Sequence, residues 1–81
     1  MTTEEIITDK QLDHVWGNAN FGSESKRDIV RYTLLKKACG YGSGSTARAI
    51  AKELGLFTEA EKLSKKGQEY LYESFRNGNN I

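Results

Sequence analysis

The chain has 81 residues and a formal net charge of +1, with 37% hydrophobic and 28% charged residues. This length supplies one hydrophobic core but not two, and the composition excludes a disordered chain. No stretch approaches the roughly 18 apolar residues of a membrane span, and the N-terminal segment is acidic where a signal peptide is basic, so we expect a cytoplasmic protein without membrane association.

Residue types that carry catalysis or bind metals are scarce. Cys39 and His14 are the only cysteine and histidine, so an internal disulfide is excluded, zinc lacks ligands, and no third partner for nucleophilic catalysis is evident. The glycine-rich segment 40–46 resembles a phosphate-binding loop but lacks the lysine that directly precedes its serine or threonine. We therefore expect no enzymatic activity, no cofactor and no metal.

Positive charge is concentrated in the middle of the sequence. Residues 1–23 carry one lysine against four acidic residues, whereas residues 24–52 carry seven lysines or arginines against two. Residues 53–81 are close to balance, with four basic and five acidic residues. If the basic side chains of the middle segment share a face, that face would attract an anionic partner; otherwise they solvate helix surfaces.

Two helices are expected in the first half of the chain. Thr8 and Gln11 have the spacing of a capping box, as do Ser25 and Asp28, and each pair predicts the start of a helix. The first helix is short, with Trp16 as its core anchor, and the second runs to about Cys39, where Gly40 can end it in a left-handed conformation. Between them, residues 17–22 form a turn with Phe21 as one buried aromatic residue.

Two further helices are expected in the second half. The third spans about residues 45–54 and is stopped by Gly55, with a small, polar and basic outer face. The fourth runs from Ser64 to about Phe75, with Tyr70, Leu71 and Phe75 turned inward. Residues 1–76 thus form a single domain, and residues 77–81 form a flexible tail.

The order of parts from residue 45 to residue 75 resembles the second half of a winged-helix domain. A small basic helix leads into Gly55, Leu56 and Phe57, a short polar hairpin follows, and the segment 63–67 matches the Leu-Ser/Thr-x-x-Gly pattern that opens the closing helix of that family. The resemblance implies a mainly α, winged-helix-like domain of about four helices with a minimal two-stranded wing. It also implies binding to duplex DNA, and commonly a homodimer.

The resemblance carries specific residues to the nucleic-acid interface. The groove-facing positions would be Ser45, Thr46, Arg48 and Lys52. The phosphate contacts would be Lys36, Lys37, Lys65 and Lys66. Two features depart from the family: the wing carries Glu59 and Glu61, which repel phosphate, and the connection 40–44 is longer than usual. The alternative is that the hydroxyl residues only cap the helix and the lysines only keep the surface soluble.

A second alignment of the motif is weaker. It takes 51–55 as the turn and the segment 58–70 as the reading helix. This arrangement would present Glu59 and Glu61 to DNA and place Gly67 inside a helix, so we rank it below the first.

The whole chain is also similar to small accessory proteins of temperate phages and enterobacterial prophages, most clearly in the segments 15–18, 27–30 and 65–73. Such proteins are often regulators or blockers of host machinery, including anti-CRISPR and other anti-defence inhibitors. This resemblance implies a host protein complex as the alternative partner. The interface would then use exposed tyrosines and the acidic wing: Tyr41, Tyr70, Tyr72, Glu59 and Glu61. Tyr72 discriminates, because its exposure would favour a protein partner or a homodimer.

Overall fold

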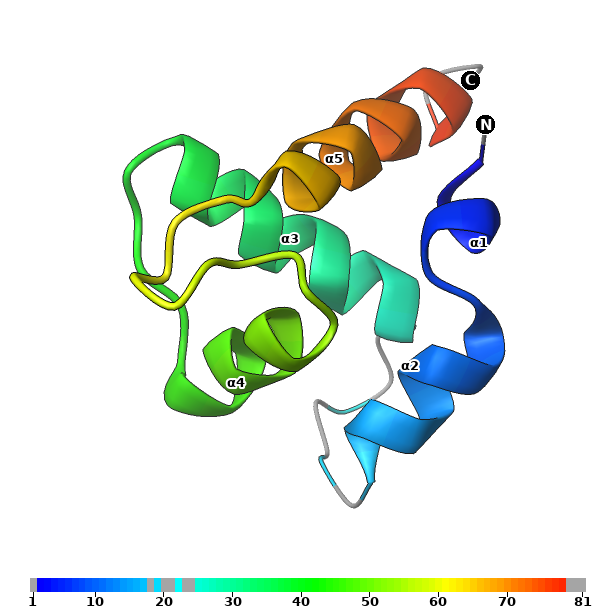
Figure 1. The fold of residues 1–81 in the computed structure, drawn as a ribbon, viewed down its shortest axis with the longest axis horizontal. Coiled ribbons are helices and arrows are strands. Elements are labelled where there is room, and N and C mark those ends of the chain that lie inside the picture. The colour runs from blue at the N-terminus through cyan, green and yellow to red at the C-terminus, as the bar shows by residue number, and fades with distance from the viewer. Residues whose placement is uncertain (1, 18, 20–21, 23–24, 79–81) are drawn as a thin grey trace.

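The computed structural model describes residues 2–17, 19, 22 and 25–78. Its five helices are α1 (Thr3–Ile6), α2 (Asp9–Trp16), α3 (Lys26–Ala38), α4 (Ser45–Glu53) and α5 (Lys65–Gly78). The expected mainly helical fold is confirmed. α3 crosses the middle of the molecule and packs against α4 and α5, while α1 lies beside α5 and α2 beside α4 (Figure 1). Within the described residues, no helix has the length and apolar character needed to cross a membrane.

Side-chain caps determine where the first helices begin. The capping box expected at Thr8 is confirmed: the Gln11 backbone N–H donates to Thr8 Oγ1 at 3.2 Å, and the Thr8 N–H donates to Gln11 Oε1 at 2.8 Å. Ser25 caps α3 by accepting from the Asp28 N–H at 3.1 Å. These bonds satisfy backbone donors that have no partner inside the helix.

The short helix α1 was not expected from the sequence. Thr2 and Glu5 form a further capping box at its start. The helix is followed by Ile7, whose side chain is fully buried. The N-terminal segment is therefore part of the core, because it delivers an apolar side chain and lies against α5.

Glycines end two helices as expected. Gly40 has a φ of 86°, and the Tyr41 N–H donates to the Lys36 carbonyl at 2.7 Å, which closes the C-terminus of α3. Gly55, with a φ of 78°, follows the end of α4. Both residues stand where a side chain would be strained. The expected turn at 17–22 with a buried Phe21 lies largely outside the described residues.

The core is assembled from every helix except α1 and from the segments beside them. Its buried hydrophobic residues are Ile7, Leu12, Trp16, Val30, Leu34, Ala47, Ile50, Ala51, Leu54, Leu56, Phe57 and Tyr70. At the edge of the core, Arg27 makes hydrogen bonds to three residues. Its Nη2 donates to the Ile7 carbonyl at 2.8 Å and to Asp9 Oδ1 at 2.7 Å, and its Nη1 donates to the Tyr70 hydroxyl at 3.3 Å. One side chain of α3 thus connects the α1–α2 junction with α5.

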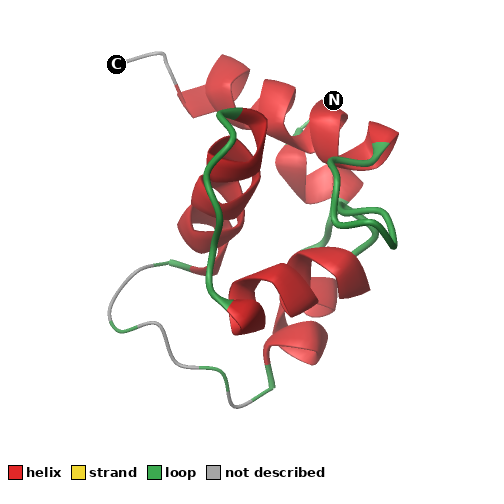
Figure 2. Cartoon of the chain, turned by 90° about the vertical axis from the view of Figure 1, so that its left-hand side faces the viewer, coloured by secondary structure: helices red, strands yellow, loops and turns green. Residues whose placement is uncertain are grey.

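The segment after α4 does not form the expected two-stranded wing. Within the described part of the chain it shows one antiparallel bridge, between Phe57 and Leu63, and Figure 2 shows loops where strands would be drawn. Thr58–Lys62 hydrogen bonding closes a tight turn, with the Thr58 N–H donating to the Lys62 carbonyl at 2.7 Å. The segments between this turn and the helices α4 and α5 are too short to form a β-ladder of several residue pairs. The weaker alignment is also wrong, because residues 58–64 are not helical.

The last helix is longer than expected. α5 begins at Lys65, next to the expected start at Ser64, and continues to Gly78. Residues 77 and 78, which were assigned to the flexible tail, are therefore helical, and residues 79–81 lie outside the described residues. Tyr70 is buried as expected, whereas Leu71 and Phe75 are only half-buried.

We predict that Gly67→Ala destabilises the fold. A Cβ atom at Gly67 would lie 2.1 Å from the Leu56 carbonyl oxygen, so α5 would have to move away from the segment that follows α4. The free energy of unfolding should fall by roughly 2–3 kcal/mol. Urea unfolding followed by circular dichroism measures it.

The matched control is Gly42→Ala, because a Cβ atom at Gly42 would meet no atom within 4 Å. Its unfolding free energy should stay within about 0.5 kcal/mol of the wild type. Equal stability of the Gly67→Ala and Gly42→Ala variants would contradict the packing described here.

Candidate functional site

The start of α5 is fixed by a serine that links two elements. Ser64 Oγ donates to the Gly55 carbonyl at 2.6 Å and accepts from the Gly67 N–H at 3.0 Å. The first hydroxyl bond reaches the end of α4, and the second caps α5. This explains the Leu-Ser-x-x-Gly pattern physically: serine caps the helix, and glycine permits close contact with the Leu56 backbone.

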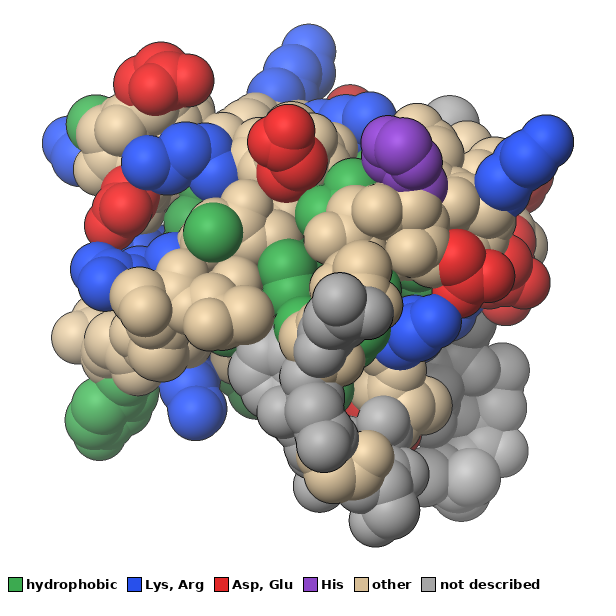
Figure 3. Space-filling view, turned by 90° about the horizontal axis from the view of Figure 1, so that it is seen from below, with side chains coloured by type: hydrophobic (Ala, Val, Ile, Leu, Met, Phe, Trp, Pro, Cys, Tyr) green, Lys and Arg blue, Asp and Glu red, His purple; other side chains and the backbone are tan. Residues whose placement is uncertain are grey.

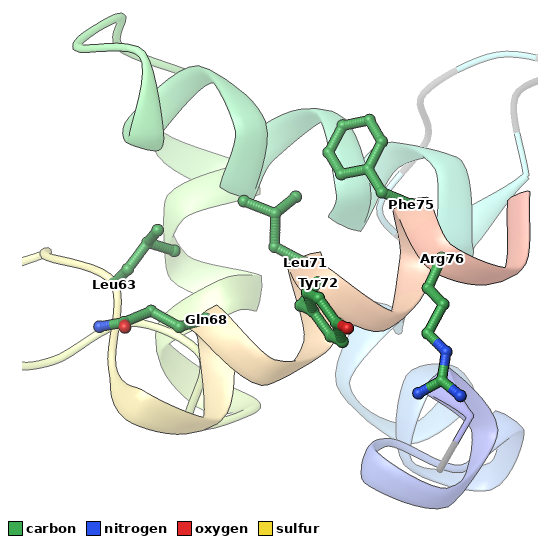
Figure 4. A pocket seen from close by; sticks show the side chains of 6 residues that line it. All are labelled: Leu63, Gln68, Leu71, Tyr72, Phe75 and Arg76. Atoms are coloured by element: carbon green, nitrogen blue, oxygen red, sulfur yellow. The ribbon is translucent and has the colours of Figure 1, made fainter. Parts of the chain in front are cut away.

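A shallow apolar groove of about 580 Å³ runs along the exposed side of α5. It is lined by Leu63, Gln68, Leu71, Tyr72, Phe75 and Arg76. Leu71 and Phe75 project to the same side of α5, and Arg76 projects away from them (Figure 4). The lining residues of α5 recur at intervals of three and four, which places them along one helix face.

Segment 62–76, which supplies the residues of the groove, carries mostly basic side chains on its surface. The exposed basic residues of segment 62–76 are Lys62, Lys65, Lys66 and Arg76, and the one exposed acidic residue is Glu69. Glu73 is buried, and its Oε2 lies 3.6 Å from Arg76 Nη1. We call Leu63, Gln68, Leu71, Tyr72, Phe75 and Arg76 the α5 groove. Lys62 precedes Leu63 in the sequence and Lys65 lies beside Gln68 and Tyr72, and we call these two lysines the basic rim of the groove. Lys66 lies elsewhere, with residues of α2 and the end of α4.

The tyrosines proposed for a protein interface lie in different environments. Tyr72 is 64% exposed at the α5 groove, and Tyr41 is 69% exposed in the loop before α4. Tyr70 is 1% exposed, and burial raises the pKa of its hydroxyl. Tyr70 is therefore a core residue and cannot contact a partner. Tyr32 on α3, which the sequence did not single out, is 41% exposed.

The groove-facing positions carried over from the winged-helix resemblance do lie on one helix. Ser45 and Thr46 are exposed at the start of α4, and Arg48 and Lys52 are half-buried. Both basic side chains contact the turn that follows: Arg48 Nη1 donates to Glu61 Oε1 at 3.1 Å, and Lys52 Nζ lies 3.4 Å from Glu61 Oε2. The acidic turn thus neutralises the basic face of α4. Glu59, from the same turn, is exposed.

The lysines assigned to phosphate contacts do not gather on this face. Lys36 is exposed near the end of α3, and Lys37 Nζ lies 5.8 Å from the centre of the Phe57 ring. Lys65 and Lys66 belong to another helix, at the start of α5. The eight predicted nucleic-acid contacts are therefore distributed over three helices.

Acidic partners engage most of the positive charge in the middle of the chain. Five of the seven lysines and arginines in residues 24–52 form ion pairs: Lys26 with Asp13, Arg27 with Asp9, Arg31 with Asp28, and Arg48 and Lys52 with Glu61. Figure 3 shows the face of α4 and α2, where basic and acidic side chains alternate. The described residues in this view form no extended patch of one sign.

Glu61 combines an unusual backbone with an electrostatic role. Its φ of 61° is the one positive value at a non-glycine among the described residues, and such a conformation costs about 1–2 kcal/mol. The hydrogen bond with Lys52 and the positive charges of Arg48, Lys52 and Lys37 hold the pKa of its carboxyl below the usual value of 4.5. The ion pairs are the visible compensation for the backbone strain.

Two features of the candidate site were missed by sequence reasoning. Both Leu71 and Phe75 are predicted to point inward, and Leu71 does pack against the core, but the two half-buried side chains also line the α5 groove. The sequence predicts Glu61 as a repellent of phosphate or as part of a protein interface, whereas in the structure it binds both basic residues of α4. The sequence does contain a signal for the contact of Glu61 with α4: the basic segment 45–53 and the acidic segment 58–61 have opposite charge and lie on either side of Gly55.

The rare reactive side chains do not build a site. His14 and Cys39 are exposed, on α2 and at the end of α3. Within the described residues, no group of three or more histidine, cysteine and carboxylate side chains is placed to hold a metal ion.

Comparison with known protein families, curated proteins and solved structures finds no match for this chain.

We predict that Glu61 titrates below 4.5 in the folded protein and that Lys52→Ala raises its pKa toward that value. Because the folded-state pKa lies below the unfolded one, the carboxylate stabilises the fold at neutral pH, and this contribution is lost as the pH falls through the folded-state pKa. NMR titration of the side-chain carboxyl carbon measures both effects.

The matched control is Lys37→Ala, because Lys37 acts on Glu61 only through its charge and lowers the pKa of this carboxyl less than Lys52 and Arg48 do. It should move the Glu61 pKa less than Lys52→Ala does. An unchanged pKa in Lys52→Ala would show that the contact between the two side chains does not persist in solution.

Proposed function

We propose that the protein is a small protein-binding module that docks a partner through the α5 groove. The observation that carries the proposal is the exposure of Tyr72, 64% of which is open to solvent beside Leu71 and Phe75. Following the resemblance to phage accessory proteins, the module would act as an inhibitor of a host or defence complex in the cytoplasm of a bacterial or phage-infected cell.

Aromatic residues beside an apolar groove are typical of protein interfaces. Tyrosine provides a large contact area and a polar tip, and it is enriched among the residues that dominate binding energy. Leu71 and Phe75 supply apolar surface next to Tyr72 that burial would remove from water. Tyr41 is exposed to a similar extent, 69%, but it lies in the glycine-rich loop before α4 and does not line this groove.

The charges around the groove specify the chemistry of the partner. The groove and its rim carry three exposed basic residues, Lys62, Lys65 and Arg76, and the exposed acidic residue beside them is Glu69. A segment that combines apolar and acidic side chains would therefore complement this surface. α5 has 14 residues and is about 21 Å long at 1.5 Å per residue. This length fits one amphipathic helix of a partner. A second copy of this chain would instead bring two basic rims together.

DNA binding is the second candidate. It is favoured by the order α3, loop, α4, bridged turn and α5, which keeps the order of helices of the winged-helix resemblance without its two-stranded wing, and by the exposure of Ser45, Thr46 and Ala49 on α4. A helix that enters the major groove needs such small side chains at its leading end. We rank it second because Glu61 engages Arg48 and Lys52, and because phosphate contacts supply most of the affinity for DNA.

A photo-crosslinking amino acid at position 72 tests the first candidate. We expect it to capture a protein in an extract of the cells that produce the chain, whereas the same group at position 41 captures none of that protein. With the captured protein purified, Tyr72→Ala should weaken binding by about 30-fold, which corresponds to an anchor worth about 2 kcal/mol. Calorimetry or anisotropy measures the affinity.

Tyr41→Ala is the matched control, because Tyr41 is 69% exposed and Tyr72 is 64% exposed. Charge variants test the acidic partner: Lys65→Glu should weaken binding, and Glu69→Lys should strengthen it. Equal effects of the two alanine variants, or the absence of any capture at position 72, would overturn the proposal. Capture of a second copy of the chain would replace it with a homodimer.

A further inference from the structure

The turn after α4 brings a carboxylate back onto the helix that precedes it. The Glu61 N–H donates to the Thr58 carbonyl at 2.8 Å, and the Lys62 N–H donates to Thr58 Oγ1 at 3.2 Å. Together with its left-handed backbone, these bonds aim Glu61 toward α4. A residue with a Cβ atom is thereby held where glycine or asparagine is usual.

Glu61 occupies the space between Arg48 and Lys52 as a ligand would. Each of its two oxygens contacts a different cation, Oε1 at 3.1 Å from Arg48 Nη1 and Oε2 at 3.4 Å from Lys52 Nζ. Arg48 and Lys52 are four residues apart, so they lie one above the other on α4. Two cations at this spacing, with one oxyanion between them, form an anion site whose present occupant comes from the chain itself.

The internal ligand leaves one donor of this site without an acceptor. Arg48 Nε is buried and makes no hydrogen bond in the structure. A planar guanidinium presents several N–H groups in a fixed fork, and phosphate oxygens can accept from two of them at once. Of the Arg48 donors, only Nη1 donates a hydrogen bond to the Glu61 carboxylate. Glu61 therefore leaves part of the Arg48 fork unused, and a phosphate group offers this fork more acceptor oxygens than the Glu61 carboxylate does.

We propose that Arg48 and Lys52 form a phosphate-binding site on α4, and that Glu61 blocks it as an internal ligand until a backbone phosphate of duplex DNA displaces it. The inference rests on DNA binding, the second candidate function, and is independent of the α5 groove. It makes the acidic turn a gate: the wild type binds DNA weakly, and loss of the Glu61 charge opens the α4 face that carries Ser45 and Thr46.

The test is an anisotropy titration of a labelled random-sequence duplex at two salt concentrations with the wild type and Glu61→Gln. Glu61→Gln should bind at least about tenfold tighter, and its affinity should depend more steeply on salt, by up to the roughly 0.9 per phosphate contact of the two freed cations. Circular dichroism checks that the variant is folded. Adding Arg48→Ala and Lys52→Ala to it should abolish the gain.

Glu59→Gln is the matched control, because Glu59 is an exposed acid in the same turn that forms no ion pair among the described residues. An equal gain in Glu59→Gln and Glu61→Gln would reveal a general charge effect and overturn the gate. Equal, measurable binding by the wild type and Glu61→Gln would also overturn it, while leaving DNA binding in place.

Two further outcomes separate the sources of failure. If neither protein binds the duplex at low salt, DNA binding itself is excluded and the gate with it, whereas the protein-binding proposal is unaffected. A phosphate site could be occupied by the DNA backbone or by a free phosphate ion. Adding inorganic phosphate to the complex of Glu61→Gln with the duplex distinguishes these two ligands. Release of DNA by phosphate far beyond the effect of chloride at equal ionic strength would indicate a small-anion site and overturn the assignment to DNA; an equal effect supports it.

Discussion

The surface of α5 depends on how this helix is rotated about its own axis. Gly67, Tyr70 and Glu73 are buried and follow one another at intervals of three residues, so one narrow stripe of α5 faces the core. The close approach of Gly67 to the Leu56 backbone and the hydrogen bond from Arg27 to the Tyr70 hydroxyl hold this stripe in place. Tyr72, two residues from Tyr70, must then lie on the far side of the helix, where it forms part of the α5 groove.

The sequence suggests a positively charged face on the basic segment 24–52, but ion pairs in the folded protein neutralise most of this charge. The basic middle segment and the acidic flanking segments meet in the fold, so Asp9 and Asp13 reach α3 and Glu61 reaches α4. Exposed ion pairs of this kind contribute little stability individually, typically below about 1 kcal/mol. Their larger effect is on recognition, because they remove the positive face that phosphate would find. The basic rim of the α5 groove, which has fewer acidic neighbours, keeps its charge available.

Much of the fold could be predicted because it follows from local rules. The caps at Thr8 and Ser25, and the glycines that end α3 and α4, act through bonds within a few residues. The rest depends on contacts distant in sequence. Arg27 reaches Ile7 and Tyr70, which no periodicity indicates. The wing requires a register between two short segments and is reduced to the Phe57–Leu63 bridge. At the candidate site, α4 was placed correctly, but the contact of Glu61 with it and the exposure of Phe75 depend on tertiary packing.

The most direct test of the central claim, that the α5 groove is a docking surface, is a chemical footprint of the tyrosines. Nitration followed by peptide mass spectrometry compares Tyr72 and Tyr41, which are 64% and 69% exposed, with the buried Tyr70 as a negative control. The two exposed tyrosines should react similarly in buffer, and an extract of the producing cells should protect Tyr72 selectively. Equal modification of Tyr72 and Tyr41 in that extract would contradict the claim that a partner covers this groove.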